Sequence, residues 1–485
     1  MFIAPQKPAE AHLNDNNSPE ALTAAAQPGA PHMLTEGPVG RTLLLFSLPI
    51  LASNVLQSLN TSINAAWIGH LIGPLALAAS ANANALLFFL ISLGFGIALA
   101  ATILVGQSLG ARDIAQAKRV MGTSYLFFGG LSVAIALIGL FLTPQLMRAM
   151  QTPPDAMALA SAYLRIIFLA VPALFLSTFL TMALRGAGDS RTPFYFMLLS
   201  AVLDVGLNPL FIAGLGPFPR LGIAGSALAT AIAQWSTLCL LLLWLRAKRH
   251  VLWIGFSERA LFRADRMILR SLLTKGVPMG LQVIVVSSSM IVMISLVDRF
   301  GSATVAAYGA CFQLWSYIQM PGFAVGSAVS SMAAQNIGAR DWRRVGRVAM
   351  AGVVYNTLLT SALVVLVTLL DKSAFALFLG QDESAIAMAR HMHLIASWSF
   401  ILFGISFVLA SVVRAAGAVL PPLLILAAAF WGVRLPFAIF LSGQGVDGVL
   451  WGFPAGSIAA VLMTALYYRH GNWRAARMLE PAITP

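Results

Sequence analysis

One acidic residue lies inside an apolar stretch of the chain. Asp204 stands in the segment Leu203–Phe211, whereas the other sixteen acids fall in the first forty residues, in connections or at the ends of apolar runs. Asn208 follows on the same face of a helix, and Pro209 frees a nearby backbone carbonyl. Because a low-dielectric surrounding favours the neutral form of a carboxyl group, Asp204 could take a proton from one side of a membrane and release it to the other. The alternative is a structural aspartate that is hydrogen-bonded to its neighbours.

The composition requires a membrane around this acid. Of 485 residues, 59% are hydrophobic and 10% are charged, against roughly 45–50% and about 25% in soluble proteins. The apolar residues come in long runs, such as 86–103, and lack the alternation of outer-membrane barrel strands. A soluble enzyme, a disordered chain and a disulfide scaffold are therefore excluded. With ~20 residues for each span, the chain is predicted to be an all-α polytopic membrane protein with about twelve transmembrane helices.

Turn residues divide the apolar runs into spans. The predicted spans are 43–68, 75–107, 117–142, 158–183, 193–213, 222–245, 270–298, 303–334, 344–369, 390–413, 421–442 and 447–468. Residues 1–40 are polar and rich in Pro and Ala, which predicts a disordered N-terminal tail, and residues 471–485 form a C-terminal tail.

The basic residues indicate the orientation in the membrane. The net charge is +13, and most of the 30 Lys and Arg fall on one side of the predicted spans, many of them in the connection 247–269. This bias places both termini and the linker in the cytoplasm and the protein in the inner membrane. It also accounts for the basic charge without a nucleic-acid partner.

The chain repeats itself. A shift of 228 residues superimposes the segment 107–113, Gln-Ser-Leu-Gly-Ala-Arg-Asp, on the segment 335–341, Gln-Asn-Ile-Gly-Ala-Arg-Asp. The halves 41–246 and 270–470 therefore form two six-helix bundles of parallel orientation, related by an axis near the membrane normal. Two such bundles enclose a central cleft that can open to either side in turn, which predicts alternating access.

The repeated residues resemble the multidrug and toxic compound extrusion (MATE) family, and are closer to its DinF-like branch than to its NorM-like branch. The resemblance covers about residues 40–470 and rests on the stretch 67–79, the doubled Gln-x-x-Gly-Ala-Arg-Asp motif, and the stretch 184–189 with Pro193. It implies twelve helices in two bundles and cation-coupled export of amphipathic compounds.

The chain departs from the family pattern at the acids. DinF-like members typically carry Asn then Asp where this chain has Asp204 then Asn208, and an acid is common at the position of Asn64. The acids of the NorM-like branch are replaced by Val286 and Phe403. With one carboxylate in place of two, proton coupling is favoured over Na⁺ coupling. The predicted ion-coupling residues are Asp204, Asn208 and Asn64, with no cofactor.

Further polar residues are candidates for the substrate cleft. Asn54, Gln57, Thr61 and Asn64 recur at spacings that place them on one helical face, where they line a substrate path or form interhelical hydrogen bonds. The second half offers Gln282, Gln313 and Tyr317.

Arg434 is as costly inside the membrane as an acid. It aligns within a residue of Asn208, so it either favours anionic or zwitterionic substrates or pairs internally.

The Gly-Ala-Arg-Asp segments are predicted to position helices. Gly110 would end its helix with a positive φ, and Asp113 with Gln116 would form a capping box on the next helix.

The leading hypothesis is a monomeric secondary antiporter that exports amphipathic, mainly cationic, small molecules or drugs in exchange for protons. The alternatives are a flippase for lipid-linked saccharides and an exporter of one specific metabolite. No catalytic set or phosphate loop emerges from the spans, so an enzyme is not expected.

Overall fold

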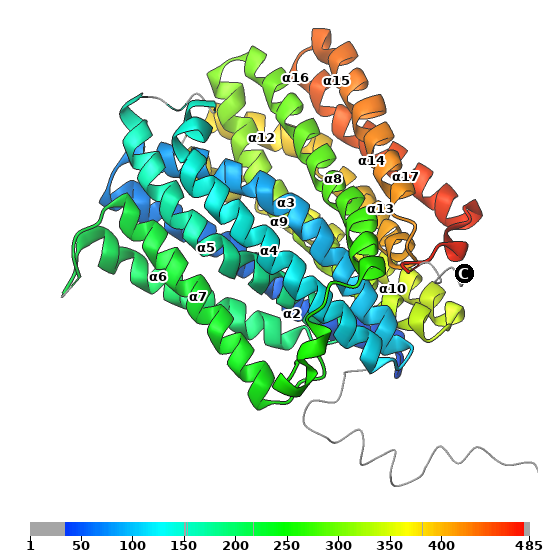
Figure 1. Ribbon diagram of the computed structural model, residues 1–485. Coiled ribbons are helices and arrows are strands. Elements are labelled where there is room, and N and C mark those ends of the chain that lie inside the picture. Colours follow the sequence, from blue (N-terminus) through cyan, green and yellow to red (C-terminus); the bar gives the residue numbers. More distant parts are fainter. Residues whose placement is uncertain (1–33, 150–151, 153, 217, 381, 480–485) are drawn as a thin grey trace, which may run out of the picture.

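The computed structural model describes residues 34–149, 152, 154–216, 218–380 and 382–479, and every regular element within these ranges is helical (Figure 1). The first six-helix bundle consists of α2 (Val39–Leu71), α3 (Pro74–Gly110), α4 (Ile114–Ala149), α5 (Pro154–Gly186), α6 (Arg191–Ala213) and α7 (Ile223–Ala247). Each predicted span of the first half coincides with one of these helices. Turn chemistry sets their ends: Gly73 has a φ of 117° and precedes a proline at the start of α3, and Gly214 caps α6 in the left-handed conformation.

The second bundle repeats the first with three interruptions. Its elements are α8 (Arg266–Val297), α9 (Ser302–Gly338), α10 (Trp342–Leu369), the short α11 (Asp371–Leu379), α12 (Glu383–Ala396), α13 (Ser399–Ala415), α14 (Leu420–Ala427), the π-helix η3 (Ala428–Arg434), α15 (Leu435–Leu441), α16 (Val446–Leu450) and α17 (Gly452–His470). The predicted tenth span is a pair, α12 and α13, bent by 42°. The π-helix interrupts the eleventh span, and the twelfth divides into α16 and α17.

Twelve spans follow from these elements. Ten described helices and the bent pair are long and apolar enough to cross a membrane. Helix α9, the eighth in chain order, brings the number of spans to twelve, because it repeats α3 at the same shift and has the same length of 37 residues. The protein is thus an all-α membrane protein of two bundles, as the sequence predicted.

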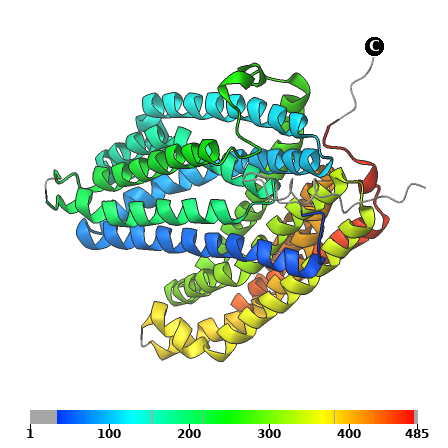
Figure 2. The same ribbon diagram turned by 90° about the horizontal axis from the view of Figure 1, so that it is seen from below.

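The two bundles meet at one end only. We call it the linker end, because α7 ends and α8 begins there, joined by residues 248–265 with the short helix η1 (Phe256–Leu261). One hydrophobic cluster joins the first bundle to the linker-end halves of α8, α9 and α13, whereas the opposite half of the second bundle has a separate core. Figure 2 shows the bundles converging at the linker end and spreading apart at the other.

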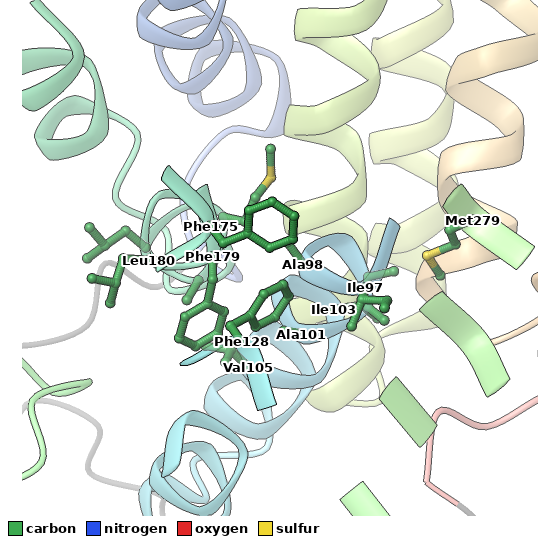
Figure 3. Packing of buried hydrophobic residues seen from close by; sticks show 14 of the residues in the cluster. Ile97, Ala98, Ala101, Ile103, Val105, Phe128, Phe175, Phe179, Leu180 and Met279 are labelled. Carbon is green, nitrogen blue, oxygen red and sulfur yellow. The ribbon is translucent and has the colours of Figure 1, made fainter. Parts of the chain in front are cut away.

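Helix α3 forms most of this junction. It packs on α8 and α9 of the second bundle, and Met279 of α8 lies beside Ile97 of α3 in Figure 3, across from Phe128, Phe175 and Phe179 of the first bundle. The backbones of α3 and α8 also touch at Gly96 and Gly280, where a Cβ on Gly96 would overlap the Gly280 backbone. Small residues allow this approach, as is common between membrane helices.

The doubled motif supplies two reciprocal hydrogen bonds across the junction. Gln107 Nε2 donates to the Ala415 carbonyl over 2.7 Å, and its repeat counterpart Gln335 Nε2 donates to the Gly186 carbonyl over 3.0 Å. We call these two contacts the glutamine latch. The Gly-Ala-Arg-Asp segments therefore do more than position helices, because the glutamine that begins each motif ties its own bundle to the other.

The glycines of the motif serve close approach rather than a turn. A Cβ on Gly110 would overlap the Gln335 carbonyl oxygen, and a Cβ on Gly338 would overlap that of Gln107. The prediction of a positive φ at Gly110 is wrong, since Arg112 and Arg340 take that conformation, with φ of 60° and 61°.

Half of the predicted capping box is present, because the Asp113 backbone N–H donates to the Ser108 carbonyl and not to the Gln116 side chain. Asp113 accepts a hydrogen bond from the Gln116 backbone N–H over 2.8 Å, and Asp341 does the same for Arg344.

Two terminal segments pack against the linker end. Residues 1–33 of the predicted tail lie outside the described residues, but Leu34 N–H donates to Gln335 Oε1 over 2.7 Å and Arg344 donates to the Glu36 and Gly37 carbonyls. At the other terminus Trp473 and Met478 are buried, and residues 480–485 lie outside the described part. Both described ends therefore belong to the folded junction, which their polar composition did not predict.

The close approach at Gly110 gives a direct test. We expect Gly110→Ala to lower the thermal unfolding temperature of the purified protein, because overpacking at a rigid backbone contact costs about 1–3 kcal/mol. The matched control is Gly129→Ala in α4, where a Cβ would meet nothing within 4 Å. Alanine there should stabilise the helix or leave the temperature unchanged. Equal temperatures for the two variants would contradict the proposed role of Gly110.

Candidate functional site

The Asp204 carboxylate is buried in the first bundle and accepts four hydrogen bonds. Its side chain is 3% exposed. Oδ2 accepts from Asn60 Nδ2 over 2.9 Å and from Asn64 Nδ2 over 2.5 Å. Oδ1 accepts from Asn208 Nδ2 over 3.1 Å and from Thr230 Oγ1 over 2.9 Å. Each carboxylate oxygen thus has two neutral donors, which fills the capacity of an ionised carboxylate.

Three helices bring these donors together. Asn60 and Asn64 are one turn apart on α2, Asn208 is one turn after Asp204 on α6, and Thr230 lies on α7. Asn208 also donates to Asn64 Oδ1 over 3.1 Å and to the Asp204 backbone carbonyl over 2.8 Å. The carboxylate is therefore the common partner of helices that are far apart in the sequence.

The charge of this carboxylate has no ionic partner. No ion pair involving Asp204 occurs in the described part of the chain, where the salt bridges join residues of the linker, the loops and the helix ends. An ionised carboxylate accepts all four bonds, but a protonated one carries a donor and must lose or reverse at least one of them. Asn60 Oδ1 and Asn208 Oδ1 are buried without a hydrogen-bond partner, so either amide can supply an acceptor by rotating.

The same oxygens could also hold a small hard cation. Besides the carboxylate, the site presents the Asn60, Asn64 and Asn208 amide oxygens and the Thr230 hydroxyl. The geometry thus allows two kinds of chemistry, binding of a proton and binding of a cation through several oxygens.

The structure brings together all three residues predicted for ion coupling, Asp204, Asn208 and Asn64. Sequence reasoning missed Asn60 and Thr230. Asn60 could have been found from its position one turn before Asn64, whereas no sequence signal places Thr230 on the facing side of another helix.

The other candidates of the first span do not reach the carboxylate. Gln57 and Thr61 are exposed, the Thr61 hydroxyl donates to the Gln57 carbonyl, and Asn54 is half-buried. Of the four residues on the predicted polar face, Asn64 alone bonds to Asp204. The members at positions 54, 57 and 61 lie away from the site, and Asn60 replaces them beside Asn64.

The candidates of the second half lie at three separate places. Gln282 accepts from Arg414 NH1 over 2.7 Å and donates to the Val419 carbonyl over 3.4 Å, so its hydrogen bonds stay within the second bundle. Gln313 donates to the Tyr317 hydroxyl over 3.3 Å, and both are half-buried on α9. Arg434 is 3% exposed at the end of the π-helix, where its guanidinium lies over the rings of Phe453 and Phe430.

Comparison with known proteins agrees with this architecture. The MatE family model matches residues 49–210 and again 278–440, so the two halves are two copies of one family unit. "Probable multidrug resistance protein YoeA" of Bacillus subtilis is 38% identical over 434 residues, covering 89% of this chain and 94% of that protein. "FAD transporter" of Shewanella oneidensis is 26% identical over 454 residues, covering 93% and 97%.

A solved structure shows the same fold. The chain in "Crystal structure of MATE in complex with MaL6" superposes with a TM-score of 0.83 at 22% identity, covering 90% of this chain and 97% of that one. The two matched halves and the relative at 38% identity show the family of the protein, and the shared fold agrees with them. The chain belongs to the MATE family, and it is a membrane transporter of the multidrug-efflux type rather than an enzyme.

Proposed function

We propose that the protein is a secondary antiporter that exports amphipathic small molecules in exchange for protons, with Asp204 as the proton carrier. The observation that carries this proposal is a buried carboxylate whose four hydrogen bonds come from neutral donors on three helices. No ion pair to this carboxylate occurs within the described residues, so a proton is the positive charge that we propose to neutralise it.

Protonation at this site would change the packing of the bundle. With Asp204 ionised, α2, α6 and α7 share one acceptor. With Asp204 neutral, the bonds to Asn60, Asn64, Asn208 and Thr230 weaken, because hydrogen bonds to charged groups are stronger than those between neutral groups. The three helices are then less firmly held together. Proton binding would thereby shift the equilibrium between conformations of the first bundle, as the coupling of proton and substrate transport requires.

The junction of the bundles provides the second part of an alternating-access cycle. The bundles are tied by the glutamine latch at the linker end and have separate cores toward the other end. Opening the linker end would break both bonds of the latch. We infer that this arrangement is the form closed toward the cytoplasm, with both termini and the basic linker inside the cell and the protein in the inner membrane.

The proposal also names a coupling ion and a class of substrate. Since the site holds one carboxylate among neutral groups, we favour the proton over Na⁺, with the amide and hydroxyl oxygens as the ligands if Na⁺ is bound. The relatives named for multidrug resistance support a broad set of amphipathic compounds. The relative named "FAD transporter" favours a second candidate function, export of one specific metabolite.

The coupling role of Asp204 is tested with purified protein in proteoliposomes. We expect an imposed pH gradient to drive a fluorescent cationic dye, and Asp204→Asn to reduce this movement to the level of empty liposomes, because an amide cannot carry the proton. The matched control is Asp298→Asn, the same change at an exposed residue at the far end of α8, which should transport like the wild type.

Other results would change the proposal in defined ways. Transport by folded Asp204→Asn at the wild-type rate would remove this residue from the mechanism. Movement driven by a Na⁺ gradient and not by pH would make the oxygen cluster a cation site and would contradict proton coupling.

Thiol labelling at the junction tests whether the glutamine latch holds the linker end closed. Ala334 is fully buried opposite Gly106, so Ala334→Cys in a background without Cys239 and Cys311 should react slowly with a membrane-impermeant thiol reagent. We expect Gln107→Ala with Gln335→Ala to raise the labelling rate from the linker side about tenfold or more, since two bonds of about 1 kcal/mol each are lost.

The control for the latch is Gln116→Ala, at the same end, because the Gln116 side chain makes no hydrogen bond within the described residues. It should leave the labelling rate unchanged. An equal rate in the double variant and the control would show that the latch does not hold the linker end closed.

A further inference from the structure

We propose that Arg434 is a binding site for an anionic group of the transported molecule, so that the substrates include aromatic amphipaths carrying a carboxylate. The inference rests on the proposed export function and adds the chemical class of the substrate. It concerns the second bundle, which contributes no residue to the Asp204 site.

Arg434 is a buried cation with few partners. Its side chain is 3% exposed, NH2 contacts the Met290 sulfur at 3.3 Å, and Nε has no hydrogen-bond partner. No ion pair to Arg434 occurs within the described residues. Internal pairing with an acid, one of the two explanations open from the sequence, is therefore not what holds this charge.

A second buried donor lies near the guanidinium. Tyr308 on α9 is 2% exposed, its hydroxyl has no hydrogen-bond partner, and it interacts electrostatically with Arg434. A guanidinium and a phenol are both suited to donate to one oxyanion, and the planar guanidinium can bind a carboxylate through two parallel hydrogen bonds. Arg434 Nε and the Tyr308 hydroxyl are both buried without an acceptor, and a bound oxyanion would supply one.

The surrounding helices are shaped around this arginine. A Cβ on Gly456 of α17 would lie 2.7 Å from Arg434 Cβ, and one on Gly452 would lie 3.0 Å from the Arg434 carbonyl oxygen. The sequence thus leaves space on α17 for a long charged side chain. The π-helix that ends at Arg434 is a local irregularity of a kind that often occurs at functional sites.

Aromatic rings complete the environment. The Arg434 guanidinium lies 3.8 Å from the centroid of the Phe453 ring and 5.3 Å from that of Phe430. Cation–π contact of this kind stabilises the arginine while no anion is bound. When an anionic group binds the guanidinium, the same rings can contact the aromatic part of the ligand. This second contact favours an aromatic amphipath over a small inorganic anion.

The internal repeat supports a site at this position. The shift of 229 residues that pairs Pro193 with Pro422 gives Asp204 the counterpart Val433, the residue before Arg434. At this shift Arg434 pairs with position 205, three residues before Asn208, so the expected alignment of Arg434 with Asn208 does not hold. Asp204 is held by α2 and α7, and Arg434 contacts α8 and α17, their counterparts in the second bundle. Corresponding places in the two bundles therefore carry opposite charges, a proton-accepting acid in one and an unpaired base in the other.

The test uses two dyes that differ in one group. Rhodamine 110 carries a free carboxylate, and rhodamine 123 is its methyl ester. We expect wild-type protein in detergent to bind both dyes by fluorescence anisotropy, and Arg434→Met to weaken binding of the free acid about tenfold or more with little change for the ester. Arg434→Lys, which keeps the charge but not the planar fork, should have an intermediate affinity for the acid.

The control for lost positive charge is Arg148→Met, at an exposed position at the end of α4, which should bind both dyes like the wild type. Equal losses for acid and ester in Arg434→Met, or no loss for either, would overturn the inference. So would failure of the wild type to bind the acid while it binds the ester.

Transport of the same dyes separates this inference from the proposed function. If the ester moves with the pH gradient in Arg434→Met but the free acid does not, both proposals stand. If neither dye moves in the wild type, the antiport proposal fails for these substrates, but the anisotropy comparison still decides whether Arg434 binds the carboxylate.

Discussion

Hydrocarbon gives a charged side chain no solvent, so every buried charge in this protein has to be stabilised by the chain itself. Two of these charges have contrasting surroundings. Asp204 is surrounded by four neutral donors, and Arg434 lies among aromatic rings with a sulfur atom as its hydrogen-bonding partner. Neither charge has an ion-pair partner in the described part of the chain. The proposed roles use this feature, since a salt bridge would compete with the binding of a proton or of an anionic group.

The internal repeat explains how one scaffold holds two different sites. Corresponding helices occupy corresponding places in the two bundles, and the doubled motif joins them through equivalent bonds from Gln107 and Gln335. At the charged positions the equivalence ends. The first bundle supplies amides and a hydroxyl, whereas the second supplies phenylalanines and glycines. The shared parts join the bundles at the linker end, and the parts that differ surround the two buried charges.

The sequence predicted the features that depend on periodicity and composition. The spans, the repeat, and the cluster of Asp204, Asn208 and Asn64 follow from residues one helical turn apart or from apolar length. The features it did not predict depend on contacts between distant segments. The Thr230 hydroxyl donates to Asp204 from another helix, Arg414 donates to Gln282 between α13 and α8, and the Leu34 N–H donates to Gln335. Gly110 illustrates the difference, since its role comes from the neighbouring bundle and not from its own φ.

Under the proposed mechanism, the hydrogen bonds at Asp204 connect protonation to the packing of the first bundle. In the arrangement closed at the linker end, all four donors point at the carboxylate, and a protonated carboxyl group would have to lose or reverse at least one of these bonds. By linkage, proton binding would disfavour the form in which all four bonds are made. Under the proposed orientation, protons entering from outside would reach the carboxylate while the linker end is closed. Binding would then loosen α2 from α6 and α7, the helices that face the Asp204 site, and favour the conformation in which the glutamine latch is broken.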